Sequence, residues 1–520
     1  FSFRKVQPKE IERILRRMKK SRSCGVDGIS SEAIRPVIRA IVPALTLVIN
    51  RSLDEGIFPN VYKCAKIIPI FKNKGNKSDP SNYRPISNLS IFGKCQEVVV
   101  DIQLREYCEK YGLFGVHQHG FRRSRSTSTA LLTAVTRWRT DRKKTYRAAL
   151  LFDLSAAYDV LSKELLIEKA RIIGITGKAI EWIRSYLSNR TQVVQINEAR
   201  SQQVNIDIGT PQGSSISCLL FALFVGDIEM WVSCTITAYA DDTFATIEAN
   251  TLTELKEKIE SEGEKVLKFF ASNGMVANPS KTGLLVFRPS IRAEDTPLKC
   301  RLSDQEIAES SEERILGVVV SNDLKWTSHV RKVKSECNYY LSVLWRLRRV
   351  LGYTQLKMIA DGVVMSRLRY CIAVHGAEQL RQNDDDQRTQ IGQDLQRIQN
   401  EMLRIITGSK KKDHVKIADM LESTKMLSIN QLIGYSILME VWKAKSFEIP
   451  HLSNLLVYDR KDDRKLRSNT NLQAVSSMVE PYAICAKNLW NQTSNRFKTT
   501  NLITVAKIEA KKVAKTLPVK

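Results

Sequence analysis

Residues 235–247, Thr-Ile-Thr-Ala-Tyr-Ala-Asp-Asp-Thr-Phe-Ala-Thr-Ile, place two adjacent acids between two short runs of β-branched and aromatic residues. Such runs favour strands, and Asp at a strand end favours a tight turn. We therefore expect a β-hairpin with Asp241 and Asp242 at its tip. Adjacent carboxylates repel each other unless a cation is bound, and Mg²⁺ binds carboxylate oxygens together with substrate phosphates. A solvated acidic turn has the same sequence, so the interpretation depends on whether another acid completes a two-metal site.

A second acid follows another strand-like segment. Residues 146–152 are mostly apolar, long enough for a buried strand, and end at Asp153. An acid at the end of a buried strand needs a partner. Asp153 is therefore the candidate for the second metal-binding carboxylate, whereas we interpret Asp159 as a helix N-cap or a salt-bridge partner.

The composition sets broad limits on the class of protein. A chain of 520 residues is too long for one core and predicts two to four domains. Lys and Arg total 81 against 55 acids, and this net charge of +26 favours a polyanionic partner such as nucleic acid. A ribosomal or membrane-surface protein would also be basic. No apolar run of membrane-spanning length is present, so no membrane association is expected.

The cysteines and histidines give little sign of a structural metal. The ten cysteines lie far apart with no Cys-x-x-Cys spacing, which indicates reduced thiols in an intracellular protein. His117 and His119 lack a third partner in sequence, so a metal site is not expected there.

The apolar periodicity predicts a mixture of helices and strands. Helices are expected over residues 8–20, 31–53 (despite two prolines), 91–110, 162–173, 177–188, 251–272 and most of 329–407. Strands are expected over residues 61–71, 192–196, 283–287 and 314–320.

Three loops carry residues suited to phosphates or nucleotides. Residues 118–127 are dense in Arg and hydroxyl groups, which suit phosphate oxygens, although a solvated basic loop would look alike. Residues 208–215 form a Gly/Pro loop that opens an apolar helix and would allow close approach of a nucleotide. Residues 410–412 are three lysines, interpreted as a solvated linker rather than a phosphate contact.

These segments follow one another in a known order. They read SCGVDGI (23–29), NYRPISNLS (82–90), HQHGFRRSRST (117–127), FDLSAAYD (152–159), GTPQGSSIS (209–217), AYADD (238–242), NPSKT (278–282) and ILGVVVSNDLKW (315–326). The series resembles the reverse transcriptase of non-LTR (LINE-type) retrotransposons, closest to Jockey-like and related clades. NLWN (488–491) also resembles the tail of such reading frames, so the resemblance covers nearly the whole chain.

The resemblance implies an α+β right-hand polymerase fold, with a palm built from an antiparallel sheet plus helices, fingers, a helical thumb and a mostly helical C-terminal region. The implied boundaries are 1–147 for an N-terminal extension and fingers, 148–160 for the first catalytic strand of the palm, 161–200 for fingers and palm helices, 201–320 for the palm, 321–414 for the thumb and 415–520 for the C-terminal region. The family's usual N-terminal endonuclease domain has no counterpart in this sequence, and no RNase H pattern is evident. We therefore expect a fragment, a processed piece or a truncated copy, with target cleavage supplied by a missing domain or another protein.

The resemblance also assigns roles at the reaction centre. Asp153 and Asp241 correspond to the metal-binding carboxylates, Asp242 to a third acid and Tyr158 to a steric gate against the 2′-hydroxyl. Lys281 corresponds to the lysine near the leaving pyrophosphate and is a candidate general acid, although it could simply cap a turn.

Further positions are implied for nucleotide and nucleic-acid contacts. The nucleotide contacts are the backbone at Phe152 and Leu154 together with Arg84, Arg122, Gln212 and Gly213. Gly317 corresponds to the primer-grip strand. A basic helix over 331–350 is expected to follow a duplex backbone, unless it is only a solvated helix face, through Arg331, Lys332, Lys334, Arg346, Arg348 and Arg349.

The expected activity is RNA-directed DNA synthesis in target-primed reverse transcription, with two Mg²⁺ ions, or Mn²⁺ in their place. The expected partners are an RNA template, a DNA primer or target DNA, and dNTPs; the oligomeric state is left open. The expected location is a ribonucleoprotein of nucleus and cytoplasm. Alternatives are an inactive RNA-binding ribonucleoprotein component that retains the fold, an RNA-dependent RNA polymerase, and an intron maturase.

Overall fold

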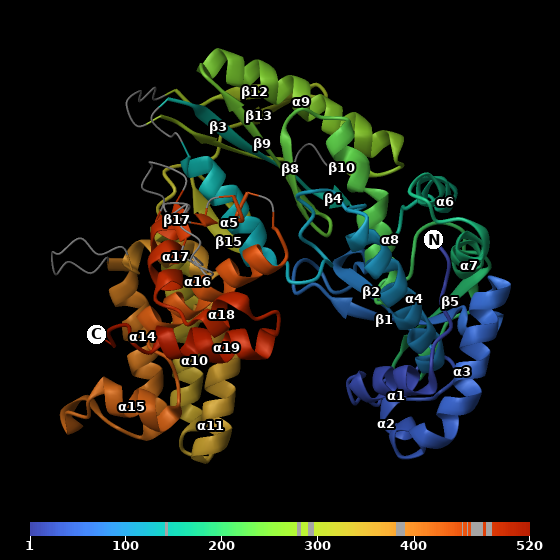
Figure 1. The fold of residues 1–520 in the computed structure, drawn as a ribbon, viewed down its shortest axis with the longest axis horizontal. Coiled ribbons are helices and arrows are strands. Elements are labelled where there is room, and N and C mark those ends of the chain that lie inside the picture. The colour runs from blue at the N-terminus through green and yellow to red at the C-terminus, as the bar shows by residue number, and fades with distance from the viewer. Residues whose placement is uncertain are drawn as a thin grey trace, which may run out of the picture.

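A four-stranded antiparallel sheet, in the order β11-β3-β9-β8, joins the two halves of the molecule (Figure 1). Its strands are β3 (Tyr146–Phe152), β8 (Thr235–Tyr239), β9 (Asp242–Ala249) and β11 (Gly283–Phe287). The computed structural model describes residues 1–140, 144–155, 157–277, 282–289, 296–380, 390–449, 451–454, 456–458, 472–474 and 481–519. Within these ranges the chain is a mixed α+β protein with antiparallel sheets and many helices.

Strand β3 is buried on both faces because each face packs against a different core. Tyr146, Ala148, Leu150 and Phe152 belong to the core of the N-terminal half. Ala149, which points to the other face, belongs to the core of the C-terminal half. Alternate residues of a strand point to opposite faces, so covering both faces explains why this segment is almost continuously apolar.

The N-terminal half combines helices with a second sheet, in which β1 pairs with β2 antiparallel and with β5 in parallel (Figure 1). Its helices are α1 (Pro8–Arg17), α2 (Ser31–Ile34), α3 (Ile38–Glu55), α4 (Ile91–Lys110), α6 (Lys163–Ile172), α7 (Gly177–Leu187), α8 (Ser215–Phe224) and α9 (Leu252–Ser272). Its strands are β1 (Cys64–Phe71), β2 (Tyr83–Asn88), β4 (Leu154–Ser155), β5 (Arg190–Ile196), β6 (Ala199–Arg200), β7 (Val204–Ile206), β10 (Val276–Ala277), β12 (Lys299–Leu302) and β13 (Gln305–Ala308).

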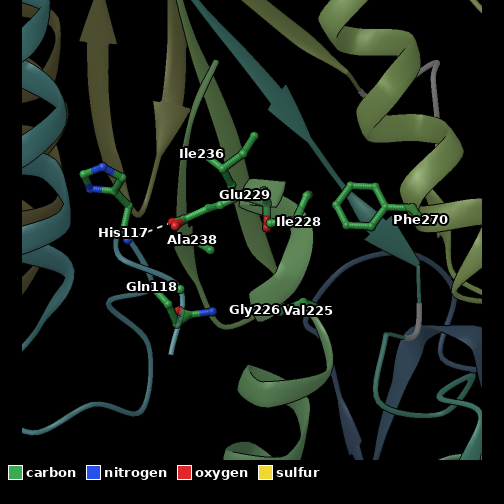
Figure 2. Close-up of a pocket in the computed structure, with 11 residues that line it drawn as sticks. His117, Gln118, Val225, Gly226, Ile228, Glu229, Ile236, Ala238 and Phe270 are labelled. Atoms are coloured by element: carbon green, nitrogen blue, oxygen red, sulfur yellow. Dashed lines mark hydrogen bonds between the residues drawn. The ribbon is translucent and has the colours of Figure 1, made fainter. Parts of the chain in front are cut away.

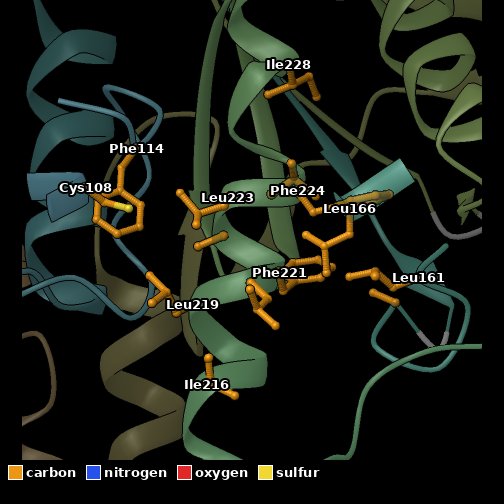
Figure 3. Packing of buried hydrophobic residues seen from close by; sticks show 14 of the residues in the cluster. Cys108, Phe114, Leu161, Leu166, Ile216, Leu219, Phe221, Leu223, Phe224 and Ile228 are labelled. Carbon is orange, nitrogen blue, oxygen red and sulfur yellow. The ribbon is translucent and has the colours of Figure 1, made fainter. Parts of the chain in front are cut away.

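Helix α8 runs through the middle of this core. Its side chains Ile216, Leu219 and Phe221 are completely buried, and Figure 3 shows Leu219 on the side of Phe114 and Phe221 on the side of Leu166. A helix that is apolar all round must be covered by protein on every side. The loop that precedes α8 is therefore held against a rigid support.

The C-terminal half is mainly helical (Figure 1). Its elements are β14 (Glu312–Ile315), β15 (Val318–Ser321), α10 (Thr327–Leu347), α11 (Tyr353–Ala360), α12 (Ser366–Arg369), α13 (Ile372–His375), α14 (Gln390–Thr407), α15 (Ile417–Thr424), α16 (Ile429–Ser446), β16 (Leu456–Tyr458), β17 (Leu472–Ala474), α17 (Pro481–Asn491), α18 (Asn495–Thr499) and α19 (Ile503–Ala514). Helix α5 (Thr127–Arg139) packs into the same core, although it precedes β3 in the chain. Trp138 of α5 stacks on Phe287 with 4.8 Å between ring centroids and so fixes the helix to the sheet.

Several element predictions are confirmed, among them the helix over 91–110 and the strand over 283–287. Two are wrong. The helix expected over 31–53 is interrupted at Arg35–Val37, because proline fits the first turn of a helix better than its interior. The strand expected over 314–320 is a hairpin that turns at Leu316 and Gly317, both of which have positive φ, as a two-residue type I′ turn requires.

Candidate active site

Three acids from two distant segments meet at one end of the central sheet. In the β3–β9 pairing Phe152 lies opposite Thr243, so Asp153 and Asp242, one residue further along on each strand, are neighbours. Asp241 lies in the turn between β8 and β9. The sequence expectation of a hairpin is confirmed, although Asp242 already belongs to β9 and the turn consists of Ala240 and Asp241.

The three carboxylates interact electrostatically. Partial burial raises the pKa of Asp242 above its ordinary value, and the negative charges of Asp241 and Asp153 raise it further. A divalent cation would relieve this repulsion, and carboxylate oxygens are ligands that Mg²⁺ prefers. Among the described residues, no three His, Cys, Asp or Glu side chains are grouped so that they could hold a metal ion by themselves. Carboxylates placed in this way fit the kind of Mg²⁺ site in which one or two carboxylates act together with substrate phosphates.

The acidic hairpin is supported from behind by residues 117–120. The backbone N–H of His119 donates to the carbonyl oxygen of Ala238 at 2.8 Å, and the N–H of Ala238 donates to the carbonyl of His117 at 3.2 Å. A Cβ on Gly120 would collide with the backbone nitrogen of Ala240, so only glycine fits at this position. The segment read as a phosphate-binding patch thus also positions the turn that carries Asp241.

A small cavity lies between this support, the strands of the hairpin and the segment after α8 (Figure 2). Its volume is about 20 Å³, and Glu229 at its edge accepts hydrogen bonds from the backbone N–H groups of Val116 and His117, both at 2.9 Å. Such a volume holds about one water molecule. The cavity is therefore a structural feature and not a nucleotide site.

Tyr158 stands beside the acids. Its ring packs on Phe221 of α8 with 4.7 Å between centroids. Burial raises the pKa of its phenol, with smaller contributions from Cys218 and from the negative charge of Asp241. The side chain is half-buried and held from below by α8, so it offers a rigid wall near Asp241.

The loop over 208–215 is tied to Tyr158 and to β2. The N–H of Thr210 donates to the carbonyl of Tyr158 at 2.9 Å, and the N–H of Ser87 donates to the carbonyl of Gln212 at 2.8 Å. Gly213 has a φ of +104°, which favours glycine. The side-chain amide of Gln212 donates to both carboxylate oxygens of Asp159, at 3.0 and 2.8 Å. The interpretation of Asp159 as a helix cap is wrong, because Ser162 caps α6 instead.

The two arginines assigned to nucleotide contacts lie in different environments. Arg84 is exposed on β2. Arg122 is only 10% exposed; its Nη2 lies 2.7 Å from Oε2 of Glu109, its Nη1 donates to the carbonyl of Gly115, and its guanidinium lies over the ring of Phe114. Arg122 thus fixes its own loop, and its charge is matched by Glu109. The short-range sequence pattern gave no sign of this pairing.

The remaining nucleotide assignments surround Asp153. The side chains of Phe152 and Leu154 are buried, which leaves only their backbone groups beside the acid. Leu154 pairs with Ala277 in the short β4–β10 ladder. Lys281 lies outside the described residues.

Gly317 and Lys332 border one pocket of about 440 Å³, together with Tyr370. The O–H of Tyr370 donates to the carbonyl of Leu316 at 2.6 Å and so holds the β14–β15 turn. The structure thus brings two of the nucleic-acid assignments together. It also adds Tyr370, for which the sequence offered no signal.

The basic helix begins and ends earlier than expected, at Thr327 and Leu347. Arg331, Lys334, Arg346 and Arg349 are exposed, whereas Lys332 and Arg348 are half-buried. Arg348 and Arg349 lie just after the helix end. Lys334 pairs with Asp394 on α14 at 3.0 Å.

Two whole-chain features complete the description. All ten cysteines are free thiols. Over the part of the chain that the structure describes, no helix has both the length and the apolar character needed to cross a membrane.

Comparison with known proteins connects this geometry to a family. The chain is 26% identical over 354 residues to a 115 kDa protein in the type-1 retrotransposable element R1DM of Drosophila melanogaster, covering 65% of this chain and 33% of the relative. It is 24% identical over 412 residues to the RNA-directed DNA polymerase from mobile element jockey of Drosophila funebris, covering 77% and 44%. It is 26% identical over 353 residues to the retrovirus-related Pol polyprotein from type-1 retrotransposable element R1 of Bradysia coprophila, covering 66% and 34%.

The chain spans a third to less than half of the length of these curated relatives. Residues 72–320 match the family described as reverse transcriptase (RNA-dependent DNA polymerase). This match contains β3, the acidic hairpin, Tyr158, the loop over 208–215 and the β14–β15 turn. The segment from residue 72 to residue 320 therefore matches the reverse transcriptase family, and the similar proteins come from retrotransposable and mobile elements.

Proposed function

We propose that the protein is an RNA-directed DNA polymerase that adds dNTPs to the 3′-hydroxyl of a DNA primer on an RNA template. The observation that carries this proposal is the meeting of Asp153 with Asp241 and Asp242 at the end of the central sheet. A basic chain with net charge +26 suits nucleic-acid substrates. The jockey relative is itself named an RNA-directed DNA polymerase.

In this proposal the elements of the molecule correspond to the palm, fingers and thumb of a right-hand polymerase. The central sheet with α8 and α9 is the palm, β1 and β2 with the N-terminal helices form the fingers, and α10 to α14 form the thumb. The boundaries are those that the sequence implies, with residues 415–520 as a C-terminal region whose described helices share a core with α10 to α14. Helix α10, with its exposed arginines, would follow the duplex backbone.

Asp153 and Asp241, with Asp242, would hold the two divalent ions. When bound, Mg²⁺ would lower the pKa of the primer 3′-hydroxyl and stabilise the charge of the pyrophosphate leaving group. The carboxylates do not react; they fix the positions of charge and of the reacting groups. Lys281 remains the proposed proton donor to the leaving group.

The neighbouring residues would select and orient the nucleotide. The ring of Tyr158, supported by Phe221, would lie under the sugar and exclude a 2′-hydroxyl. The backbone around Gln212 and Gly213 would pack on the incoming nucleotide and template, with Arg84 directed to the triphosphate. Because Arg122 is already paired with Glu109, we propose that it acts through the position of its loop.

The proposed role is target-primed reverse transcription, which the relatives from retrotransposable elements support, and the proposed location is a ribonucleoprotein of nucleus and cytoplasm. Target-primed reverse transcription requires an endonuclease, supplied by another domain or another protein. The RNA template and the target DNA are then the macromolecular partners of the chain.

Primer extension by the purified chain on an RNA template tests the proposal. Asp241→Asn removes one negative charge with little change in shape and should reduce extension by at least about 100-fold. Asp304→Asn is the matched control, because Asp304 is likewise an exposed aspartate in a hairpin turn, between β12 and β13. Equal extension by both variants would overturn the assignment. Tight RNA binding without any incorporation in Mg²⁺ or Mn²⁺ would favour the inactive RNA-binding component.

A further inference from the structure

Helices α10 and α14 lie side by side and run in the same direction. Lys334 is 3.0 Å from Asp394, and Arg348 donates to the carbonyl of Gly408 at 2.9 Å. Arg348 and Gly408 each lie 14 residues after the first pair, so the helices stay in register over about 21 Å. A seam of this length is open to solvent along one side of the C-terminal half.

Two hollows of about 550 and 310 Å³ lie along this seam, and Trp345 borders both. We name the continuous feature the α10–α14 groove, with Lys334 and Arg397 at one end, Trp345 in the middle, and Lys410 and Lys411 at the other end. Lys410 and Lys411, which belong to the segment interpreted from the sequence as a solvated linker, therefore border a concave surface.

The groove is strongly basic. Two acids line it, Asp394 and Glu401, and Asp394 is already paired with Lys334 at 3.0 Å and with Arg397 at 3.7 Å. Against these two acids stand six basic side chains among the described lining residues: Lys334, Arg348, Arg397, Arg404, Lys410 and Lys411. A concave surface with this excess attracts a polyanion.

Trp345 gives the groove an aromatic platform. The chain has seven tryptophans, five of which are fully or almost fully buried, whereas Trp345 is 52% exposed. The guanidinium of Arg349 lies 5.0 Å from its ring centroid and supports it. An exposed indole held in place by an arginine suits stacking with a planar ligand.

We propose that the α10–α14 groove binds a single strand of nucleic acid, with its phosphates on the basic side chains and one base stacked on Trp345. A basic groove interrupted by an aromatic ring is how proteins hold single strands with little sequence preference. A duplex keeps its bases stacked inside and would leave Trp345 without a partner. Lys334 and Arg348, which the sequence assigns to duplex contacts, face this groove instead.

Fluorescence anisotropy with labelled oligonucleotides of about ten nucleotides tests the proposal on the full chain. Trp345→Ala should weaken binding of single-stranded RNA by about 5- to 150-fold, and Trp345→Phe should restore much of the affinity. Trp231→Ala is the matched control, since Trp231 is 60% exposed in the other half of the molecule. Circular dichroism confirms that each variant is folded.

The charge contribution is measured as the salt dependence of the same binding. Lys410→Ala combined with Lys411→Ala should reduce the slope of log affinity against log salt by about 1.4, the value for two phosphate contacts. Lys507→Ala with Lys511→Ala, two exposed lysines of α19, should leave the slope unchanged. Repeating the measurement with a DNA oligonucleotide of the same sequence shows whether the groove prefers RNA or DNA.

Equal weakening by Trp345→Ala and Trp231→Ala, or unchanged binding in Trp345→Ala, would overturn the proposal. So would a blunt duplex that binds as tightly as the single strand and loses the same affinity with Trp345→Ala. The measurement needs no nucleotide incorporation, so it is decided separately from the polymerase proposal.

Discussion

The side-chain amide nitrogen of Gln212 donates hydrogen bonds to both carboxylate oxygens of Asp159, which lies 53 positions earlier in the chain. The donor–acceptor distances are 2.8 and 3.0 Å. This bond joins the loop before α8 to the segment that carries Tyr158. Partial burial raises the pKa of Asp159, and the hydrogen bond from Gln212 opposes that rise, as expected for a donor that favours the carboxylate.

Asp159→Ala should therefore loosen the loop over 208–215 without removing any of the three acids. We expect a higher KM for dNTP with a smaller change in kcat, and a loss of about 1 kcal/mol of unfolding free energy. Steady-state primer extension and urea unfolding measure the two effects. In a double-mutant cycle, Gln212→Ala should add little to the effects of Asp159→Ala. Fully additive effects would mean that the hydrogen bond between the two side chains contributes nothing to them.

The proximity of the acids predicts a change in titration that does not depend on activity. Asp153→Asn and Asp241→Asn should each lower the pKa of Asp242 toward its ordinary value, because each removes a nearby negative charge. NMR of a chain labelled at its aspartate carboxyl carbons follows this titration. Asp304→Asn should leave it unchanged, and an unaltered Asp242 in both test variants would contradict the convergence of the three groups.

Tyr158 is expected to set the choice between deoxyribose and ribose. Tyr158→Ala opens space beside Phe221 and should raise rNTP use relative to dNTP use by at least about tenfold. Tyr158→Phe keeps the ring and should keep the selectivity. The readout is the ratio of kcat/KM values for the two sugars; a ratio that stays the same in Tyr158→Ala would remove the gate assignment.

Two buried histidines predict acid sensitivity of the C-terminal half. The rings of His329 and His375 lie 4.9 Å apart, and burial lowers the pKa of His329 to about 4 and that of His375 to about 3. Because folding favours their neutral forms, the stabilisation is present above pH 6.5 and is lost as the pH falls toward 4. Each group should contribute about 1.4 kcal/mol per pH unit in that window.

Urea unfolding at a series of pH values measures this loss. His329→Gln should make the fall of the unfolding free energy with decreasing pH shallower by the contribution of one proton. Gln is chosen because its side-chain oxygen can still accept a hydrogen bond from the N–H of Val319. His414→Asn, at an exposed position with positive φ, should leave the pH dependence as it is. A slope unaffected by His329→Gln would assign the acid sensitivity to other groups.

The sequence predicts well what depends on local pattern. The run before Asp153 is a buried strand, and the β-prone runs around Asp241 form a hairpin. Both were predictable because the preference for a strand depends on residues that are neighbours in the sequence. The turn at Gly317 was missed because the run around it is apolar without a break, although its glycine was a signal.

Side-chain pairing across long separations could not be predicted in this way. Gln212 with Asp159, and Arg122 with Glu109, depend on how α8 and α4 place their loops, and no local pattern encodes that placement. The same holds for Tyr370, which reaches the β14–β15 turn from 54 positions later in the chain.

The packing of α5 into the core of the C-terminal half has a practical consequence for any shorter version of the chain. A polypeptide that stops near residue 320 would retain every segment matched by the family, yet it would uncover the apolar sides of α5 and of the β14–β15 hairpin by removing α13 and α10, which pack against them. Such a truncation should aggregate on expression, because a large exposed apolar surface associates with other chains. The helices beyond residue 320 are therefore as necessary for a soluble product as the strands that carry the acids.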